Sequence, residues 1–412
     1  MSDSKTYLKT INTGAPSGLL RFIITIPVFC EPELRKTLQS ILNQTEFQAH
    51  TEVLLVFNYP ENASSEIKEQ NNQQYIEINS WAKKVNNDTL RFIPILANDL
   101  PAKHAGAGFA RKTGMDFAAD RFQSIKQPGG FILSLDADSI LSENYLQETE
   151  RILKEKEKTN TLIYNFAHPT EGTEYNKQVY KAVALYELHL RYYKYMLKST
   201  GFPYYHYTIG SCFGVKAEIY SKSGGMSKRK AGEDFYFLQK VFPYGHVEFL
   251  PDTFVYPSPR PSWRVPFGTG PTIRKLLNSP IQKYETYHPE SFRHLTMLFE
   301  QADKYYLANA DQINELNTNL NSELVNFLDS NNFNNKIAEI SGNTSSRESF
   351  IKRFYQWFDA FMLIRFLNWH RDNCCGTIDV VTAVKEILKL KANPDTFALL
   401  NKLRQLDIPT TS

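Results

Sequence analysis

The residues most able to take part in binding or catalysis are two aspartates, Asp136 and Asp138, in the stretch GGFILSLDADSILSENYL. They follow the apolar run FIL directly, and this run predicts a buried strand. Two carboxylates one residue apart repel each other, and a divalent cation held by hard oxygen ligands would relieve that repulsion. Because Mg²⁺ and Mn²⁺ combine a few carboxylates with phosphate oxygens, the pair predicts a metal site for a diphosphate substrate. The alternative is a turn in which Asp138 or Ser139 caps the next helix.

A second acidic pair, Glu233 and Asp234, opens the helix predicted for GEDFYFLQKV. Acidic residues at a helix N-terminus are favourable for dipole reasons alone, and this is the structural interpretation of the pair. In the functional interpretation, one of the two carboxylates is a general base that takes the proton of a hydroxyl group.

Three arginines are candidates for binding an anion. Arg111 follows two glycines in GAGFARKTG, which resembles a phosphate-binding turn at a helix start. The motif does not complete G-x-G-x-x-G, so a dinucleotide site is not expected. Arg260 and Arg264 lie in SPRPSWRVPFGTG, where two guanidinium groups would suit a departing diphosphate. Each arginine could instead be a solvated surface cation.

The elements that must position these side chains alternate between strands and helices. Strands are predicted at 21–29, 51–58, 90–96 and 129–138, and helices at 31–44, 64–85, 106–122 and 142–156. This alternation predicts βαβ units and a mainly parallel sheet, in which ligands bind beyond the carboxyl ends of the strands. Asp136 and Asp138 stand at such an end.

The rest of the chain is less regular and becomes helical. A long helix is predicted at 175–199, a helix after Gly232, and two short strands with a loop within 246–270. From about residue 276 helical patterns follow one another, including a long one at 347–373, and the Asn-rich stretch 330–336 is predicted to be a linker. The expected organisation is an N-terminal tail (1–20), a sheet domain (21–275) and a C-terminal helical region (276–412).

Composition excludes several classes of protein. The 47 basic and 44 acidic residues give a net charge of only +3, so no nucleic-acid partner is expected. Four cysteines without disulfide or zinc-knuckle spacing favour reduced thiols in a cytoplasmic protein, and His206 and His246 lack metal-ligand spacing. The sequence shows no signal peptide and no apolar run of membrane-spanning length, so any membrane association would be peripheral, at the inner face.

The motifs IPVFCEP, GAGFARKTG, LSLDADSIL and GEDFYF, in this order, resemble the family 2 glycosyltransferases with the GT-A fold. The resemblance covers about residues 21–275 and leaves out the C-terminal helices. It implies an α/β fold, in which a nucleotide-sugar-binding GT-A sheet is sandwiched by helices, and a Mn²⁺ or Mg²⁺ cofactor. A UDP-sugar is the favoured donor.

The resemblance also implies roles for the residues that match its motifs. Pro27 and Glu31 would hold the nucleoside, and Asn58 stands where the family usually has an aspartate that holds the base. Asp136 would bind ribose and metal, and Asp138 would be the more direct metal ligand.

For the reaction itself, the resemblance implies that Asp234, with Glu233 second, deprotonates the acceptor hydroxyl. Arg111, Arg260 and Arg264 would complete the nucleotide-sugar site and stabilise the leaving diphosphate.

The expected activity is therefore a metal-dependent sugar transfer with inversion, to a glycan, lipid-linked or protein acceptor, as in bacterial-type glycan biosynthesis. The Q-x-x-R-W element of processive synthases is missing, which favours single additions. Alternatives are a retaining GT-A transferase, a nucleotidyltransferase, or a non-catalytic module that binds a glycan or a partner. The C-terminal helices would form a homo-oligomer or recognise the acceptor.

Overall fold

The computed structural model describes residues 8, 13–103, 105–229, 232–262, 268–391 and 394–408. The chain divides into two compact units, and each is described by itself. The first unit comprises residues 1–183, 207–278 and 408–412, and the second comprises 184–206 and 279–407.

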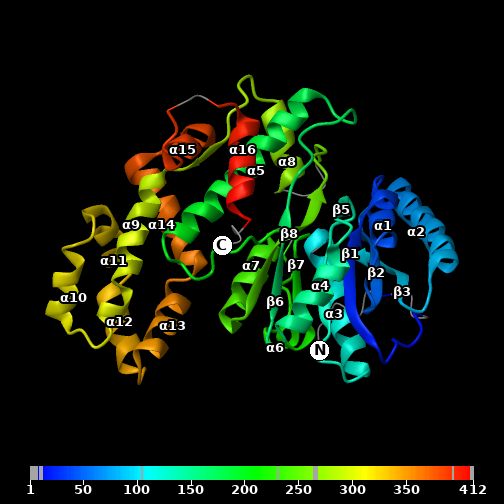
Figure 1. Cartoon of the computed structure of the whole chain (residues 1–412), viewed down its shortest axis with the longest axis horizontal. Coiled ribbons are helices and arrows are strands. Elements are labelled where there is room, and N and C mark those ends of the chain that lie inside the picture. Colours follow the sequence, from blue (N-terminus) through cyan, green and yellow to red (C-terminus); the bar gives the residue numbers. More distant parts are fainter. Residues whose placement is uncertain are drawn as a thin grey trace. The chain divides into compact units, whose positions relative to one another are not determined.

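An eight-stranded sheet forms the centre of the first unit (Figure 1). Its strands are β1 (Leu20–Val28), β2 (His50–Pro60), β3 (Leu90–Leu100), β4 (Phe131–Ser134), β5 (Ser139–Leu141), β6 (Thr161–Phe166), β7 (Phe213–Lys216) and β8 (Val247–Pro257). Their spatial order is β3-β2-β1-β4-β7-β6-β8-β5. The first four of these and the β6/β8 pair are parallel, whereas β7 is antiparallel to both neighbours and β5 is antiparallel to β8.

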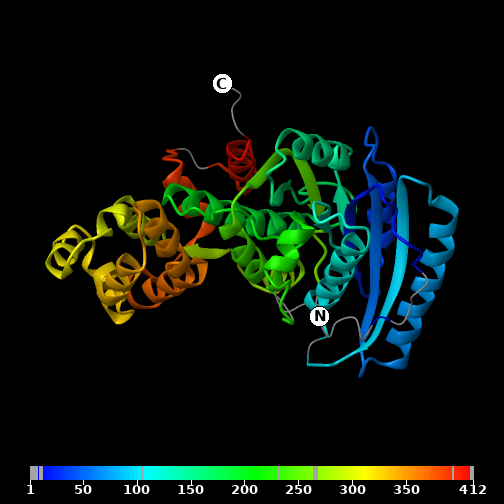
Figure 2. The same cartoon turned by 90° about the horizontal axis from the view of Figure 1, so that it is seen from below.

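Helices cover the sheet on both sides. The helices of this unit are α1 (Leu34–Leu42), α2 (Ser65–Val85), α3 (Ala107–Ser124), α4 (Tyr145–Glu155), the start of α5 (Lys177–Ser199), α6 (Ala217–Lys222), α7 (Glu233–Val241) and α8 (Thr269–Leu277). In Figure 2, α2 and α3 lie on opposite faces of the β1–β3 end, and both contact β2. Strands covered on both faces are apolar almost throughout, as the buried sequence LRFIITIPV of β1 illustrates.

The chain leaves the centre of the sheet immediately after β4. The amide of Leu135 still donates to the carbonyl of Thr25 on β1 at 3.1 Å, but β5 already pairs with β8 at the edge of the sheet. The segment 136–138 therefore crosses from the centre toward the edge, beyond the carboxyl ends of the parallel neighbours β1 and β4. The predicted placement of Asp136 and Asp138 at such an end is confirmed.

The second unit is helical, apart from one small antiparallel pair of strands. Its helices are the rest of α5, α9 (Pro289–Glu300), α10 (Ala310–Asn317), α11 (Ser322–Ser330), α12 (Phe333–Gly342), α13 (Arg347–Trp357), α14 (Ala360–His370), α15 (Val380–Ile387) and α16 (Thr396–Leu406). The strands β9 (Glu285–Tyr287) and β10 (Thr377–Asp379) pair with each other. The predicted fold class, an α/β sheet flanked by helices with a C-terminal helical region, is confirmed.

Three local predictions are wrong. The stretch 330–336 is not a linker, because Phe333, Ile337 and Ile340 bury one face of α12 and outweigh its asparagines. The pattern at 347–373 contains two α-helices: Phe358 leaves helical geometry, and the Asp359 carboxylate accepts from the first amides of α14. The two strands expected within 246–270 are one strand, β8, whose pairing with β6 shifts register.

The structure also bears on two expectations from the sequence, the state of the cysteines and the lack of membrane-spanning segments. All four cysteines are free thiols. In the part of the chain that the structure describes, no helix has the length and apolar character needed to cross a bilayer.

Candidate functional site

A buried arginine on α3 connects the two acidic motifs. Arg111 donates from Nε to Glu233 at 3.2 Å and from Nη2 to Asp136 at 2.7 Å. Its Nη1 donates to the Ser134 hydroxyl at 2.8 Å and to the Gly210 carbonyl at 3.1 Å. Burial alone would lower the pKa of Arg111, but the Asp136 and Glu233 carboxylates outweigh it and raise the pKa, so the guanidinium stays charged. We call this group the Arg111 cluster, and it consists of Arg111, Ser134, Asp136, Gly210, Glu233 and Asp234.

Two glycines allow these elements to approach so closely. A Cβ atom on Gly108 would lie 2.4 Å from the carbonyl oxygen of Arg229 and 2.8 Å from Cδ of Glu233. A Cβ atom on Gly210 would lie 2.8 Å from Nη2 of Arg111. Any side chain at either position would push the start of α7 or the guanidinium away, so the cluster depends on both glycines.

The surroundings of Asp234 change the ionisation of its carboxyl group. Desolvation of its carboxyl group, followed by repulsion from Glu233, raises the pKa of Asp234 to about 7, against the opposing pull of Arg111. Its Oδ1 accepts from the amide of Phe235 at 2.8 Å, which orients the group at the start of α7. A base whose pKa lies near neutrality exchanges protons efficiently at physiological pH.

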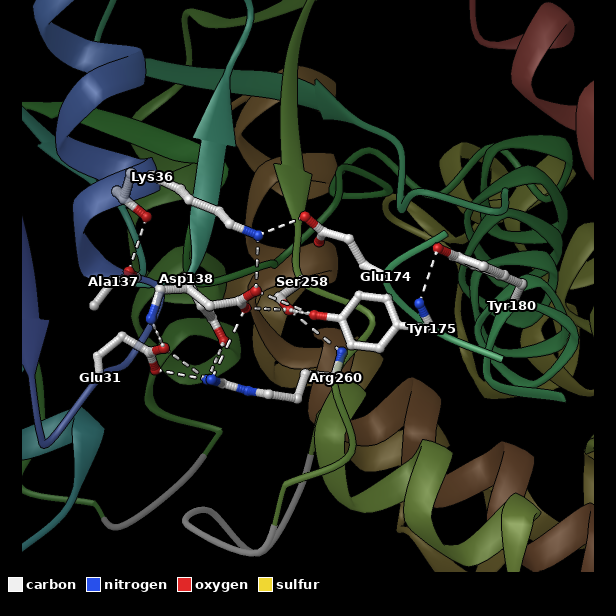
Figure 3. A network of polar contacts seen from close by, with 11 residues as sticks. Glu31, Lys36, Ala137, Asp138, Glu174, Tyr175, Tyr180, Ser258 and Arg260 are labelled. Atoms are coloured by element: carbon white, nitrogen blue, oxygen red, sulfur yellow. Dashed lines mark hydrogen bonds and ion pairs between the residues drawn. The ribbon is translucent and has the colours of Figure 1, made fainter. Parts of the chain in front are cut away.

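A second arginine gathers the residues that follow β1 and β4 (Figure 3). Nη2 of Arg260 donates to both carboxylate oxygens of the buried Glu31, at 2.8 and 2.7 Å, and lies 3.7 Å from Oδ2 of Asp138. Ser258 and Tyr175 donate to Glu33, at 2.8 and 3.1 Å. We call this group the Arg260 cluster, and it consists of Glu31, Glu33, Asp138, Tyr175, Ser258 and Arg260.

The D-x-D segment joins the two clusters, because Asp136 pairs with Arg111 and Asp138 with Arg260. The hydroxyl of Thr37 on α1 donates to the carbonyl of Ala137 at 2.8 Å and fixes the backbone between them. The side chains of Asp136 and Asp138 are 36% and 32% exposed, although both contact arginines.

These two aspartates fit a hard divalent cation. Their oxygens are the ligand type that Mg²⁺ and Mn²⁺ prefer, and their exposure lets a ligand reach them. Among the residues that the structure describes, they do not gather with a third acid, histidine or cysteine in ligand geometry. Phosphate oxygens and water would then complete the coordination, as is usual for Mg²⁺ in nucleotide sites.

The other predicted site residues have different surroundings. Pro27 is the next-to-last residue of β1, paired in register with Val56. Asn58 on β2 is buried, and its Nδ2 donates to the carbonyl of Val28 at 2.8 Å, so its amide ties β2 to the end of β1. Arg264 lies outside the described residues.

Sequence reasoning missed five members of the two clusters: Glu33, Ser134, Tyr175, Gly210 and Ser258. Glu33 could have been found, since it stands two residues after Glu31 in the same short turn. The others had no usable signal, because their bonds join residues far apart in the chain, such as Ser258 with Glu33 across 225 positions.

Comparison with known proteins yields structural neighbours only. No protein-family model matches the chain, and no curated protein is similar in sequence. A solved structure of residues 1–349 of S. aureus TarS in complex with UDP-GlcNAc is similar at 12% identity and a TM-score of 0.41, over 73% of this chain and 79% of that one. The mannosyltransferase PcManGT from Pyrobaculum calidifontis, in complex with GDP-Man and Mn²⁺, is similar at 13% identity and a TM-score of 0.37, over 94% and 93%.

Proposed function

We propose that this protein is a metal-dependent, non-processive glycosyltransferase that moves a sugar from a nucleotide sugar to an acceptor hydroxyl with inversion. The observation that carries the proposal is the bridging position of Arg111, which holds Asp136 and Glu233 in one cluster with Asp234. A metal-binding pair and a base with raised pKa, joined in this way, are what sugar transfer from a diphosphate donor requires.

In this proposal one acidic motif binds the cation and the other supplies the general base. Asp136 and Asp138 would hold Mn²⁺ or Mg²⁺, and the bound cation would supply Lewis-acid stabilisation of the leaving diphosphate. Asp234 takes the proton of the acceptor hydroxyl, whose oxygen forms a bond to the anomeric carbon. The bond from that carbon to the pyrophosphate oxygen breaks on the opposite face, and the nucleoside diphosphate leaves with the electron pair.

The arginines have different tasks. Arg111 already donates to four protein groups, so we assign it to positioning Asp136 and the start of α7. Arg260 is less buried and lies beside Asp138, so it is the guanidinium that would meet the pyrophosphate. Arg264 is proposed as its partner on sequence grounds alone.

The nucleoside would be held beyond the ends of β1 and β2. Pro27, Glu31 and Asn58 follow or end these strands, in agreement with ligand binding at the carboxyl edge of the sheet. Because Asn58 presents an amide that is already bonded to Val28, base recognition here would rely more on the backbone than on a carboxylate. A UDP-sugar remains the favoured donor.

A donor screen tests the proposal. The full-length chain is incubated with Mn²⁺ and UDP-, GDP- and CMP-sugars, and the released nucleotide is measured with and without EDTA. We expect slow hydrolysis of one donor class that EDTA abolishes and that the Asp138→Asn variant loses.

Each alternative predicts a different outcome, in this screen or in a binding, triphosphate or product assay added to it. A nucleotidyltransferase would consume a nucleoside triphosphate and a sugar phosphate and release pyrophosphate. A non-catalytic module would neither bind nor hydrolyse any donor, and a retaining transferase would give a product of unchanged anomeric configuration by NMR. Any of these three results would contradict the proposal.

A further inference from the structure

Three helices of the second unit bring together two histidines and a glutamate that play no part in the proposed reaction. His294 comes from α9, Glu323 from α11 and His370 from the end of α14. One ligand atom from each residue lies within 4.8 Å of the other two. Oε2 of Glu323 is 2.8 Å from Nε2 of His370 and 4.0 Å from Nδ1 of His294.

The nitrogen that His294 directs at this group lacks a hydrogen-bond partner. Both histidines are buried, and Nδ1 of His294 is a buried polar atom without a partner in the described chain. A buried, unsatisfied polar atom is costly and calls for an explanation such as a bound ion.

His370 is oriented from its other side. Its Nδ1 lies 2.9 Å from the hydroxyl of the buried Ser291 and 3.1 Å from Sγ of Cys375, leaving Nε2 to face Glu323. Ligating histidines are commonly fixed in this way by a polar group on the second ring nitrogen. With the ring proton on Nδ1, the Nε2 lone pair of His370 would face the Glu323 carboxylate, and a cation between these two acceptors would pair with both.

We propose that His294, Glu323 and His370 form a zinc-binding site that ties α9, α11 and α14 together. Two imidazole nitrogens and one carboxylate are ligands that Zn²⁺ accepts in tetrahedral geometry. Bonds of about 2.0–2.2 Å place tetrahedral ligands about 3.4 Å apart, so the His370–Glu323 contact opens and the His294–Glu323 separation closes, each by roughly half an ångström. The fourth position is taken by water or by Cys374, an exposed free thiol four residues after His370.

The full-length chain, stripped with EDTA, is titrated with Co²⁺ and then with Zn²⁺ and followed by visible absorption. We expect one equivalent of Co²⁺ to give the intense visible bands of a tetrahedral nitrogen and oxygen site, and Zn²⁺ to displace it. An additional thiolate charge-transfer band in the near ultraviolet would identify Cys374 as the fourth ligand, and its absence would identify water. A hexacoordinate site of carboxylates at Asp136 and Asp138 gives only weak bands, so the two metal sites are distinguishable.

Three variants test whether the tetrahedral Co²⁺ spectrum comes from the proposed zinc site. His294→Gln should abolish the tetrahedral spectrum, and Ser291→Ala should weaken Zn²⁺ about 10–100-fold through loss of ring orientation. His246→Asn is the matched control, since His246 is an exposed histidine at positive φ, where asparagine is tolerated, and should bind like the wild type.

The wild-type chain tests the proposal even if a variant fails to fold. Zn²⁺ should raise its midpoint of thermal unfolding by a few degrees, because a ligand that binds only the folded state stabilises it. A wild-type chain without a tetrahedral Co²⁺ spectrum, or a His294→Gln variant that keeps it, would overturn the zinc site. Neither result bears on donor hydrolysis, so the proposed glycosyl transfer is tested separately.

Discussion

The Arg111 and Arg260 clusters use the same chemistry in two different environments. Each pairs a guanidinium group with one aspartate of the D-x-D segment and with a glutamate, but the Arg111 side chain is 4% exposed and that of Arg260 is 20% exposed. Arg111 lies on a helix and contacts the ends of β4 and α7, whereas Arg260 follows the last strand of the sheet. The buried cluster is suited to fixing geometry, and the more exposed one can exchange a protein carboxylate for a phosphate oxygen.

The largest difference between the clusters should appear in catalysis. Asp234→Asn removes the proposed base from the Arg111 cluster, and we expect transfer to fall about 10²–10⁴-fold while donor affinity stays near that of the wild type. Steady-state rates and calorimetric donor binding measure the two effects. An Asp234→Asn variant with full turnover would remove the base assignment.

The difference in stability between Asp234→Asn and the wild type should depend on pH. The pKa of Asp234 is raised on folding, so its stabilising contribution is complete below about pH 4, the unfolded value, and is lost as the pH rises through about 7. Asp234→Asn should therefore unfold at a higher temperature than the wild type at pH 8 but not at pH 4. Equal shifts at both pH values would contradict the raised pKa.

Removing each arginine should separate stability from donor binding. Arg111→Met leaves the buried Glu233 carboxylate without its partner and should cost about 3–5 kcal/mol of the free energy of unfolding. Arg260→Met breaks a pair whose arginine is 20% exposed, so water can reach the freed Glu31 carboxylate, and it should cost about 1–3 kcal/mol, less than Arg111→Met. Urea unfolding measures both variants, and Arg121→Met is a matched control, because Arg121 is equally buried and pairs with Glu52 outside both clusters. Equal costs for Arg111 and Arg260 would remove the distinction between the clusters.

Arg260→Met, the variant with the smaller loss of stability, should have the larger loss of donor affinity. Loss of charged hydrogen bonds to the pyrophosphate should weaken donor binding about 10–100-fold in Arg260→Met. Calorimetry of the folded variant measures this effect, and Lys36→Met is its control, because Lys36 is a nearby cation that pairs with Glu174. Wild-type donor affinity in Arg260→Met would exclude Arg260 from the leaving-group site.

The smallest expected effect is a shift of the pH profile. The transfer rate, plotted against pH, should rise as Asp234 loses its proton near pH 7. Because Glu233→Gln removes a like charge beside Asp234, this rise in rate should move to lower pH by about one unit. Glu33→Gln, in the Arg260 cluster, should leave the pH of this rise unchanged. A rise that stays at the same pH in Glu233→Gln would show that another group controls the rate.

The contrast between the clusters also explains what could be predicted from the sequence. Asp136, Asp138, Glu233 and Asp234 were recognisable because each pair is local and lies at the end or start of an element whose apolar pattern is clear. The joining of the two pairs was not predictable, because Arg111 meets Glu233 across 122 positions and needs glycines at 108 and 210.

The second unit shows the same limit more strongly. His294, Glu323 and His370 have no ligand spacing in the sequence, and they meet only because three separate helices pack together. The asparagines of α12 likewise indicated a linker, since the burial that makes this segment helical is tertiary.

The central claim is that Asp136 and Asp138 bind a divalent cation together with the pyrophosphate of an activated sugar. Calorimetric titration of the wild-type chain with the donor found in the screen, with Mn²⁺ and then with EDTA, tests it most directly. We predict binding at one site with Mn²⁺ and at least about a tenfold loss of affinity, equal to 1.4 kcal/mol, in EDTA or in the Asp138→Asn variant. Donor binding of equal strength with Mn²⁺, with EDTA and in Asp138→Asn would contradict the account.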